Sequence, residues 1–463
     1  MEKRERLIKP ELGRSYPSAS YGSGIYIVDA DGKRYIDASS GAVTASIGHG
    51  VKEMIDAMSE QAKKVSFVYR SQFTSEPAER LAEKLSRILP DADYWSFFVN
   101  SGSEATETAM KIAIQHWQEK GQRSKVKVLS RRMSYHGITL GALSMSGHAA
   151  RRRRFVPLLE EFPVVAPAYC YRCPFGLTHP ECGLRCADDL ETAIRRIGPE
   201  HIAAFIAEPV VGAAGGAVVP PEGYFQRIKA ICEAYDVLFI ADEVMTGIAR
   251  TGAMLGIEHW GVEPDLIALG KGMTASYTPM AAALAKDTVM EPIMNGSKVV
   301  MSGHTYSANP QSAAVALAVL EYVEKHDLVA AAGRSGAYLL EKLTELSARC
   351  EMIGDVRGKG LLLALELVAD RDARRPFPPE LAVTSRVVEK AFANGLLLYP
   401  AAGGDGDGDA VIIAPPLVIG FEQIDEVVRL VELTLHDVMQ ELGYEVAAGA
   451  AAVEAGETEA GDE

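Results

Sequence analysis

The spacing of apolar residues changes along the chain and predicts three kinds of structure. Near the N-terminus, two strand-like runs flank Asp31-Gly32, which predicts a β-hairpin over residues 24–37. From about residue 76 to 330, short apolar runs alternate with helical patterns, as in a wound, mainly parallel sheet. Long helical patterns with a few strands follow. We predict strands at residues 94–99, 126–129, 203–207, 237–241, 266–269, 361–367 and 395–399.

These patterns predict an α/β protein with two domains. The 463 residues exceed the roughly 250–300 at which a single hydrophobic core stops growing. We expect a large domain over residues 61–324, and a smaller α+β domain formed from both chain ends, residues 1–60 and 325–444. Residues 445–463 contain six acids and no base, which predicts a disordered acidic tail.

Composition narrows the choice of partners. The formal net charge of −15 argues against nucleic acid or an anionic membrane as the main partner. No apolar run reaches the roughly 18 residues of a membrane span, and the first six residues lack the apolar core of a signal peptide. We therefore expect a cytoplasmic protein whose six cysteines are reduced.

Polar residues follow three of the predicted strands, at the sheet edge where open α/β folds bind ligands. Residues 101–103, Ser-Gly-Ser, begin a helix and suit an anion, although a plain serine N-cap would explain them too. Asp242 needs a cationic partner or caps a turn. Lys271, between two glycines, is either a desolvated nucleophile or a turn lysine in solvent.

One ligand would satisfy all three positions together. Pyridoxal 5'-phosphate (PLP) carries a phosphate, a ring nitrogen that needs an acid, and an aldehyde that reacts with a lysine. The motifs of rival ligands are missing, because the chain has no P-loop around Lys271, no dinucleotide fingerprint and no nucleophile elbow. The joint occurrence therefore predicts a PLP enzyme.

From about residue 20 to 440, the chain resembles the class III aminotransferases, or omega-transaminases, which are fold type I PLP-dependent enzymes. The resemblance rests on Ser101-Gly102-Ser103-Glu104-Ala105, Tyr135-His136-Gly137, Ala207-Glu208-Pro209, Asp242-Glu243-Val244, Ala268-Leu269-Gly270-Lys271-Gly272 and Gly303-His304-Thr305-Tyr306. It implies that Lys271 holds PLP as a Schiff base. It also implies ping-pong transfer of an amino group from an omega-amino acid or amine to an oxo acid such as pyruvate.

The resemblance also implies a role for each matching residue. It assigns the phosphate to Ser101, Gly102 and Ser103, the ring faces to Tyr135 (beside His136) and Val244, the ring substituents to Glu208, the ring nitrogen to Asp242, and the neighbouring subunit's phosphate to Thr305. Core packing remains the alternative for Tyr135 and Val244. The threonine implies a homodimer with shared active sites, and further assembly to a tetramer stays open.

The substrate is less well defined than the cofactor. Ile412 and Tyr399 stand where some relatives carry a carboxylate-binding arginine, and Val43 belongs to a run of small residues at the expected substrate pocket. The arginines at residues 151–154 either attract an acidic substrate or form a solvated face. A PLP-dependent racemase, aminomutase or lyase, and a non-catalytic PLP-binding protein, remain alternatives.

Four cysteines form a separate candidate site. Cys170, Cys173, Cys182 and Cys186 have short paired spacings, as in structural zinc sites, although the gap between the pairs is shorter than in common zinc fingers. Free thiols are the alternative, so a structural zinc ion is a second, separate cofactor prediction.

Overall fold

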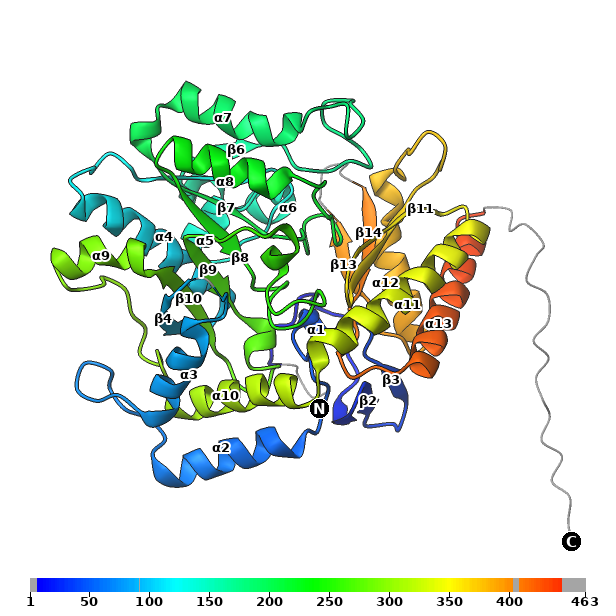
Figure 1. Ribbon diagram of the computed structural model, residues 1–463. Helices are drawn as coiled ribbons and strands as arrows, with labels where there is room; N and C mark the ends of the chain where they lie inside the picture. The colour runs from blue at the N-terminus through cyan, green and yellow to red at the C-terminus, as the bar shows by residue number, and fades with distance from the viewer. Residues whose placement is uncertain (1–5, 91, 403–407, 444–463) are drawn as a thin grey trace, which may run out of the picture.

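A seven-stranded sheet forms the centre of the larger domain in the computed structural model, which describes residues 6–90, 92–402 and 408–443 (Figure 1). Its strand order is β4-β10-β9-β8-β7-β5-β6. Only β10 runs antiparallel to its neighbours. The strands are β4 (Tyr94–Val99), β5 (Lys127–Arg131), β6 (Val164–Val165), β7 (Ile202–Ala207), β8 (Leu238–Asp242), β9 (Leu266–Leu269) and β10 (Ala281–Lys286).

Helices cover both faces of this sheet, which explains why its central strands are apolar throughout. Successive residues of β7 point to opposite faces. Ile206 packs in one cluster with Ile112 of α4 (Gly102–Glu119). Phe205 packs in another cluster with Phe225 of α8 (Tyr224–Ala234). Figure 1 shows α4 and α8 on opposite sides of the sheet.

The five strands predicted for this sheet are confirmed, and two of its strands, the two-residue β6 and β10, were not predicted. The bounds of β4 and β9 agree with the prediction, and those of β5, β7 and β8 differ by one or two residues. Strand β10 has the sequence Ala-Ala-Ala-Leu-Ala-Lys, whose alanines favour helix in isolation. Its pairing with both β4 and β9 overrides that preference.

The smaller domain combines segments from both chain ends. A four-stranded antiparallel sheet has the order β11-β12-β14-β13. The elements are β11 (Ile353–Lys359), β12 (Leu362–Leu367), β13 (Tyr399–Ala402) and β14 (Asp409–Ile413), with helices α11 (Leu328–Arg349), α12 (Val383–Ala393) and α13 (Phe421–Glu441). The strand predicted at residues 395–399 is wrong, because β13 begins only at Tyr399 and Leu396 forms a single bridge to Ile36.

The N-terminal segment is attached to this domain through its backbone. The predicted hairpin is confirmed as β2 (Tyr26–Asp29) and β3 (Arg34–Ile36), and β1 (Ala19–Ser23) adds a third strand. The Ile36 N–H donates to the Gly395 carbonyl at 2.8 Å, and the Ala414 N–H donates to the Ala38 carbonyl at 2.7 Å. Helices α2 (Lys52–Lys64), α3 (Glu76–Ser86) and α10 (Pro310–Lys325) pack together beside the larger domain.

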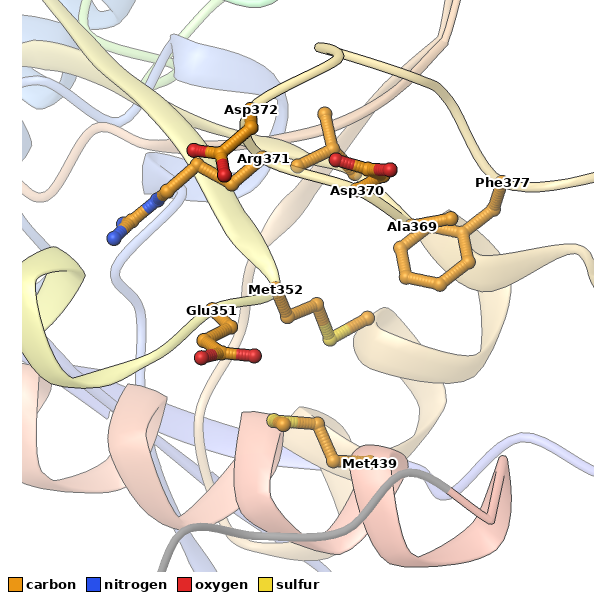
Figure 2. Close-up of a pocket in the computed structure, with 9 residues that line it drawn as sticks. Glu351, Met352, Ala369, Asp370, Arg371, Asp372, Phe377 and Met439 are labelled. Atoms are coloured by element: carbon orange, nitrogen blue, oxygen red, sulfur yellow. The ribbon is translucent and has the colours of Figure 1, made fainter.

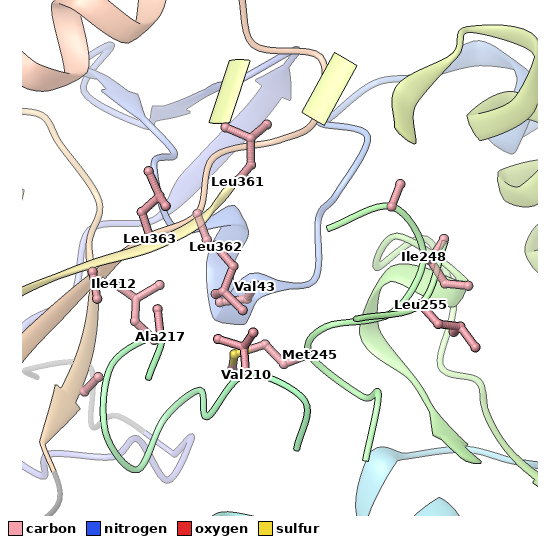
Figure 3. Packing of buried hydrophobic residues seen from close by; sticks show 14 of the residues in the cluster. Val43, Val210, Ala217, Met245, Ile248, Leu255, Leu361, Leu362, Leu363 and Ile412 are labelled. Carbon is pink, nitrogen blue, oxygen red and sulfur yellow. The ribbon is translucent and has the colours of Figure 1, made fainter. Parts of the chain in front are cut away.

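Buried apolar side chains from the two domains meet in one core. Figure 3 shows Val43 of the N-terminal segment close to Val210 and Met245 of the larger domain, with Leu362 of β12 beside them. This packing fixes the smaller domain against the carboxyl ends of the central strands, where ligands bind in open α/β sheets. Within the described ranges, no helix is long and apolar enough to cross a membrane.

Candidate active site

A cavity of about 180 Å³ lies at the carboxyl ends of the central strands. It is lined by Gly102, Ser103, Tyr135, His136, Gly137, Glu208, Gly212, Ala213, Asp242, Val244, Met245 and Lys271. A larger cavity, about 340 Å³, lies in the smaller domain among Glu351, Met352, Arg371, Phe377 and Met439 (Figure 2), and holds none of the predicted site residues. The strand-end cavity is therefore the candidate active site.

The first turn of α4 forms one wall of this cavity. Ser101 caps the helix, because its hydroxyl accepts the Glu104 N–H at 3.2 Å, while Glu104 Oε2 accepts the Asn100 N–H at 2.7 Å. The Ser103 hydroxyl accepts the Ile138 N–H at 3.0 Å. A Cβ on Gly102 would lie 2.7 Å from Val244 Cγ1, so only glycine lets the helix start approach the loop after β8. The helix start favours an anion.

Asp242 ends β8 and forms the acidic part of the site. Its carboxylate is 4% exposed, and Oδ2 lies 2.7 Å from Nδ1 of the buried His136. Oδ1 accepts the Val244 N–H at 3.1 Å. Each carboxylate oxygen has lone pairs beyond these partners, so Asp242 can accept a further N–H from a ligand in the cavity. Glu243, next in the chain, is bonded to the Gly256 and Ile257 amides and does not line the cavity.

Glu208 follows β7 and forms a second acidic group in the cavity. Its Oε1 accepts the Tyr135 N–H at 3.2 Å, and its Oε2 lies 3.7 Å from the buried Arg131 guanidinium. Burial raises the pKa of the Glu208 carboxyl, whereas the charges of His136 and Arg131 act in the opposite direction. Glu208 therefore holds the segment that begins at Tyr135 against the sheet.

Lys271 follows β9 and faces the cavity from the sheet. Its φ of 40° lies in the left-handed region, which is strained for a residue with a side chain. Burial lowers the pKa of the Lys271 amine to about 8. The charge of Asp242 acts in the opposite direction, and the charges of Arg151 and Arg250 lower the pKa further. Lys271 thus carries a larger fraction of neutral, nucleophilic amine at neutral pH than an exposed lysine.

Four predicted residues lie outside the cavity lining. Ser101 is the cap behind the α4 wall. Tyr399 is the first residue of β13. Val43 is 2% exposed and belongs to the interdomain core, where it lies close to Met245, a residue of the cavity lining (Figure 3). Thr305 is exposed and does not reach the cavity of its own chain.

Sequence reasoning missed several residues of the site. Gly212, Ala213 and Met245 line the cavity, and the Arg151 guanidinium lies 4.3 Å from the centre of the Tyr135 ring. The run of small residues after β7, Gly212-Ala213-Ala214-Gly215-Gly216, was the available signal for the first two. Nothing in the arginine run distinguishes Arg151 from its neighbours.

The structure does not support the predicted zinc site. Cys170 is exposed, Cys173 and Cys182 are half-buried, and Cys186 is buried in α7 (Arg185–Ile197). Burial raises the pKa of the Cys186 thiol to about 11, and the neighbouring cysteines act in the same direction. Within the part of the chain that the structure describes, no group of three or more potential ligands is arranged to hold a metal ion.

The fold and this cavity define a fold type I transferase that uses PLP, and comparison with known proteins gives the family. The model of the family "Aminotransferase class-III" matches residues 15–435. The chain belongs to the class III aminotransferases and is a PLP-dependent aminotransferase.

Curated relatives and solved structures agree with this assignment. The uncharacterized aminotransferase YodT of Bacillus subtilis (strain 168) is 53% identical over 94% of this chain and 98% of its own length. The putrescine–pyruvate aminotransferase of Pseudomonas aeruginosa is 35% identical over 88% of both chains. An amine transaminase of an uncultivated Pseudomonas species, in its PLP-bound form, is 34% identical with a TM-score of 0.89 and covers 95% of this chain and 100% of that one. An (S)-enantioselective omega-transaminase of Thermomicrobium roseum is 39% identical, with a TM-score of 0.86, over 92% of this chain and 93% of its own.

Proposed function

We propose that the protein transfers the amino group of an omega-amino acid or amine to an oxo acid such as pyruvate, with Lys271 as the residue that holds PLP as a Schiff base. One observation carries the proposal: an anion-binding helix start, a buried carboxylate and a lysine of lowered pKa line a single cavity. Each feature has another explanation alone, but together they match the phosphate, ring nitrogen and aldehyde of one molecule.

The residues present fit that cofactor. Ser101, Gly102 and Ser103 offer the phosphate a helix start without a blocking Cβ. Asp242 has free lone pairs for the ring N–H, and His136 positions its carboxylate. Tyr135 and Val244 both line the cavity and would pack against the ring, and Glu208 would lie near its substituents.

Asp242 and Lys271 would carry different parts of the amino-group transfer. Bound PLP supplies an electron sink for the bond that breaks at the amine-bearing carbon. Asp242 keeps the ring nitrogen protonated and so sustains that sink. Lys271 would hold the cofactor and, when released by an amine substrate, would supply the amine that takes up and returns the transferred proton. A second substrate, the oxo acid, would then reverse the path in a ping-pong cycle.

The proposed substrates draw on what is known of similar proteins. The Pseudomonas aeruginosa relative is named for putrescine and pyruvate, and the Thermomicrobium roseum neighbour is an omega-transaminase. Putrescine is a diamine without a carboxylate and falls within the donor class that we propose here.

We also propose a homodimer. Thr305 is exposed on its own chain, Tyr306 beside it is 62% exposed, and the 40% exposed Phe67 has its ring 6.2 Å from the Tyr306 ring. An interface there would cover these apolar side chains and would bring Thr305 of the partner subunit to the phosphate. Assembly beyond a dimer is not needed for this arrangement.

A donor screen tests the proposed reaction. Purified holoenzyme is mixed with taurine, β-alanine, 4-aminobutyrate or an aryl amine, without acceptor, and the cofactor absorbance is followed. We expect at least one donor to convert the bound cofactor stoichiometrically to its amine form, and pyruvate to restore the aldehyde form. A donor that is racemised, rearranged or cleaved while the cofactor never reaches the amine form would contradict transamination.

The lowered pKa of Lys271 predicts a pH dependence for cofactor loading. Only the neutral amine attacks an aldehyde, and a pKa of about 8 means that its fraction rises about tenfold from pH 6 to 7 and levels off above pH 8. When PLP is added to the apoprotein, the loading rate should follow the same curve. A rate that keeps rising to pH 10 would show that the amine has an ordinary lysine pKa.

A further inference from the structure

Arg151 occupies a position beside the cavity that neither the cofactor nor the protein interior explains. It lies on the short helix α6 (Ala149–Arg152), which places its guanidinium 4.3 Å from the centre of the Tyr135 ring. Tyr135 lines the cavity together with Lys271. The positive charge of Arg151 also contributes to the lowered pKa of the Lys271 amine.

The other arginines around the cavity are already bound to protein acceptors. The Arg152 Nη1 donates to the carbonyls of Leu143, Ser144 and Ser146 at 2.7–2.9 Å. The Arg250 Nη1 donates to the Leu361 and Pro415 carbonyls at 3.0 and 2.6 Å. The Arg131 Nη2 donates to the Glu208 carbonyl at 2.5 Å. Arg152 and Arg250 are therefore engaged by backbone carbonyls, and Arg131 by the backbone and the carboxylate of Glu208.

Arg151 differs from these three arginines in its partner, and from the last two arginines of the run in its exposure. Its guanidinium lies over the Tyr135 ring and, through its charge and a side-chain hydrogen bond, opposes the rise that burial causes in the pKa of the Tyr135 hydroxyl. Arg151 forms no ion pair with a carboxylate in the described ranges. It is half-buried, whereas Arg153 and Arg154 are exposed. A guanidinium that is partly removed from water and lacks an anion is suited to bind one, because its fork of N–H groups matches a carboxylate bidentately.

We propose that Arg151 binds the carboxylate of the oxo-acid acceptor and of donors that carry a carboxylate. The assignment rests on the proposed function and narrows its substrate class to molecules with a carboxylate on the side of the cavity formed by Tyr135. Ile412 stands where some relatives carry a carboxylate-binding arginine, but it is fully buried in β14 and cannot reach a substrate. Arg151 would supply the carboxylate site that is missing at that position. Arg151 would be a specificity residue that orients the substrate and takes no part in proton transfer.

The kinetic test compares pyruvate with propanal, an acceptor of the same chain length without a carboxylate. In Arg151→Gln holoenzyme, we expect kcat/KM for pyruvate to fall about 10- to 100-fold, as for a lost hydrogen bond to a charged group, while propanal changes by less than about twofold. Arg151→Lys should recover part of the loss because it keeps the charge. Arg154→Gln, in the same arginine run but exposed, should behave like the wild type.

A binding measurement separates this inference from the proposed reaction. Propionate has a carboxylate and no reactive carbonyl, so its calorimetric Kd for the holoenzyme reports the carboxylate site without turnover. We expect Arg151→Gln to weaken propionate binding at least about tenfold, with Arg154→Gln unchanged. Arg151-dependent propionate binding in a protein that transfers no amino group would refute the proposed function and leave the carboxylate site standing.

Three outcomes would overturn the assignment. One is an equal loss with pyruvate and propanal, which would mean that Arg151 only supports Tyr135. Another is no change with either acceptor, which would place the carboxylate elsewhere. The third is propionate binding that is absent from the wild type or unaffected by Arg151→Gln. Thermal unfolding of each variant checks that none of these results comes from loss of the fold.

Discussion

Replacing Lys271 with alanine is expected to abolish multiple turnover, with a fall in kcat of more than about 10³-fold. The alanine variant loses both the amine that attaches PLP and the base that moves the proton. The remaining contacts, at the start of α4 and at Asp242, should still bind the cofactor, so the variant should hold PLP that dialysis removes. Steady-state kinetics and cofactor absorbance before and after dialysis measure the two effects.

Two further variants separate the nucleophile from other roles of a lysine. Lys271→Arg keeps a positive charge but cannot form the Schiff base, so it should be as inactive as Lys271→Ala. Lys286→Ala removes a lysine at the opposite edge of the same sheet, where Lys286 pairs with Glu263 at 2.5 Å, and should keep wild-type activity. A Lys271→Ala enzyme with wild-type kcat would refute the role assigned to this residue.

The Asp242→Asn substitution is expected to lower kcat by at least about 10²-fold, comparable with removal of one electrostatic stabiliser in other active sites. Asparagine preserves the size of the side chain but supplies no negative charge opposite the ring nitrogen. The Schiff base to Lys271 should still form, because that bond does not depend on Asp242. Single-turnover conversion of the cofactor to its amine form measures the slowed step.

Asp265→Asn is the matched control for this substitution. Asp265 accepts the Phe239 N–H at 2.7 Å at the beginning of β8, the opposite end of the strand that Asp242 terminates. Its replacement should affect stability more than rate. If Asp242→Asn and Asp265→Asn slowed single turnover equally, the loss would reflect damage to β8, and the assignment of Asp242 to the ring nitrogen would fail.

The sheet and the cofactor site were largely predictable because strand ends carry a local signal. An apolar run followed by a polar residue placed Asp242 after β8 and Lys271 after β9, and both face one cavity. Parallel strands bring their carboxyl ends to one edge, so the chain order of these motifs was enough to group them. The alanine-rich β10 was missed because nothing local distinguishes it from a helix.

The rest of the site depends on tertiary contacts that leave no local pattern. Arg151 lies in a run of arginines that most resembles a solvated face, and only the placement of α6 brings its guanidinium onto Tyr135. Val43 was expected to line the substrate pocket, but the smaller domain buries it in the interdomain core. The cysteine spacing suggested zinc, whereas the described fold leaves Cys170 exposed and Cys186 buried.

Borohydride reduction of the purified holoenzyme, followed by peptide mass spectrometry, tests the central claim most directly. Reduction converts a lysine Schiff base into a stable pyridoxyl adduct at the residue that held the cofactor. We expect one such adduct, on the peptide that contains Lys271, and none when the holoenzyme is first converted by an amine donor. An adduct on another lysine, or none in protein that carries PLP, would contradict the account.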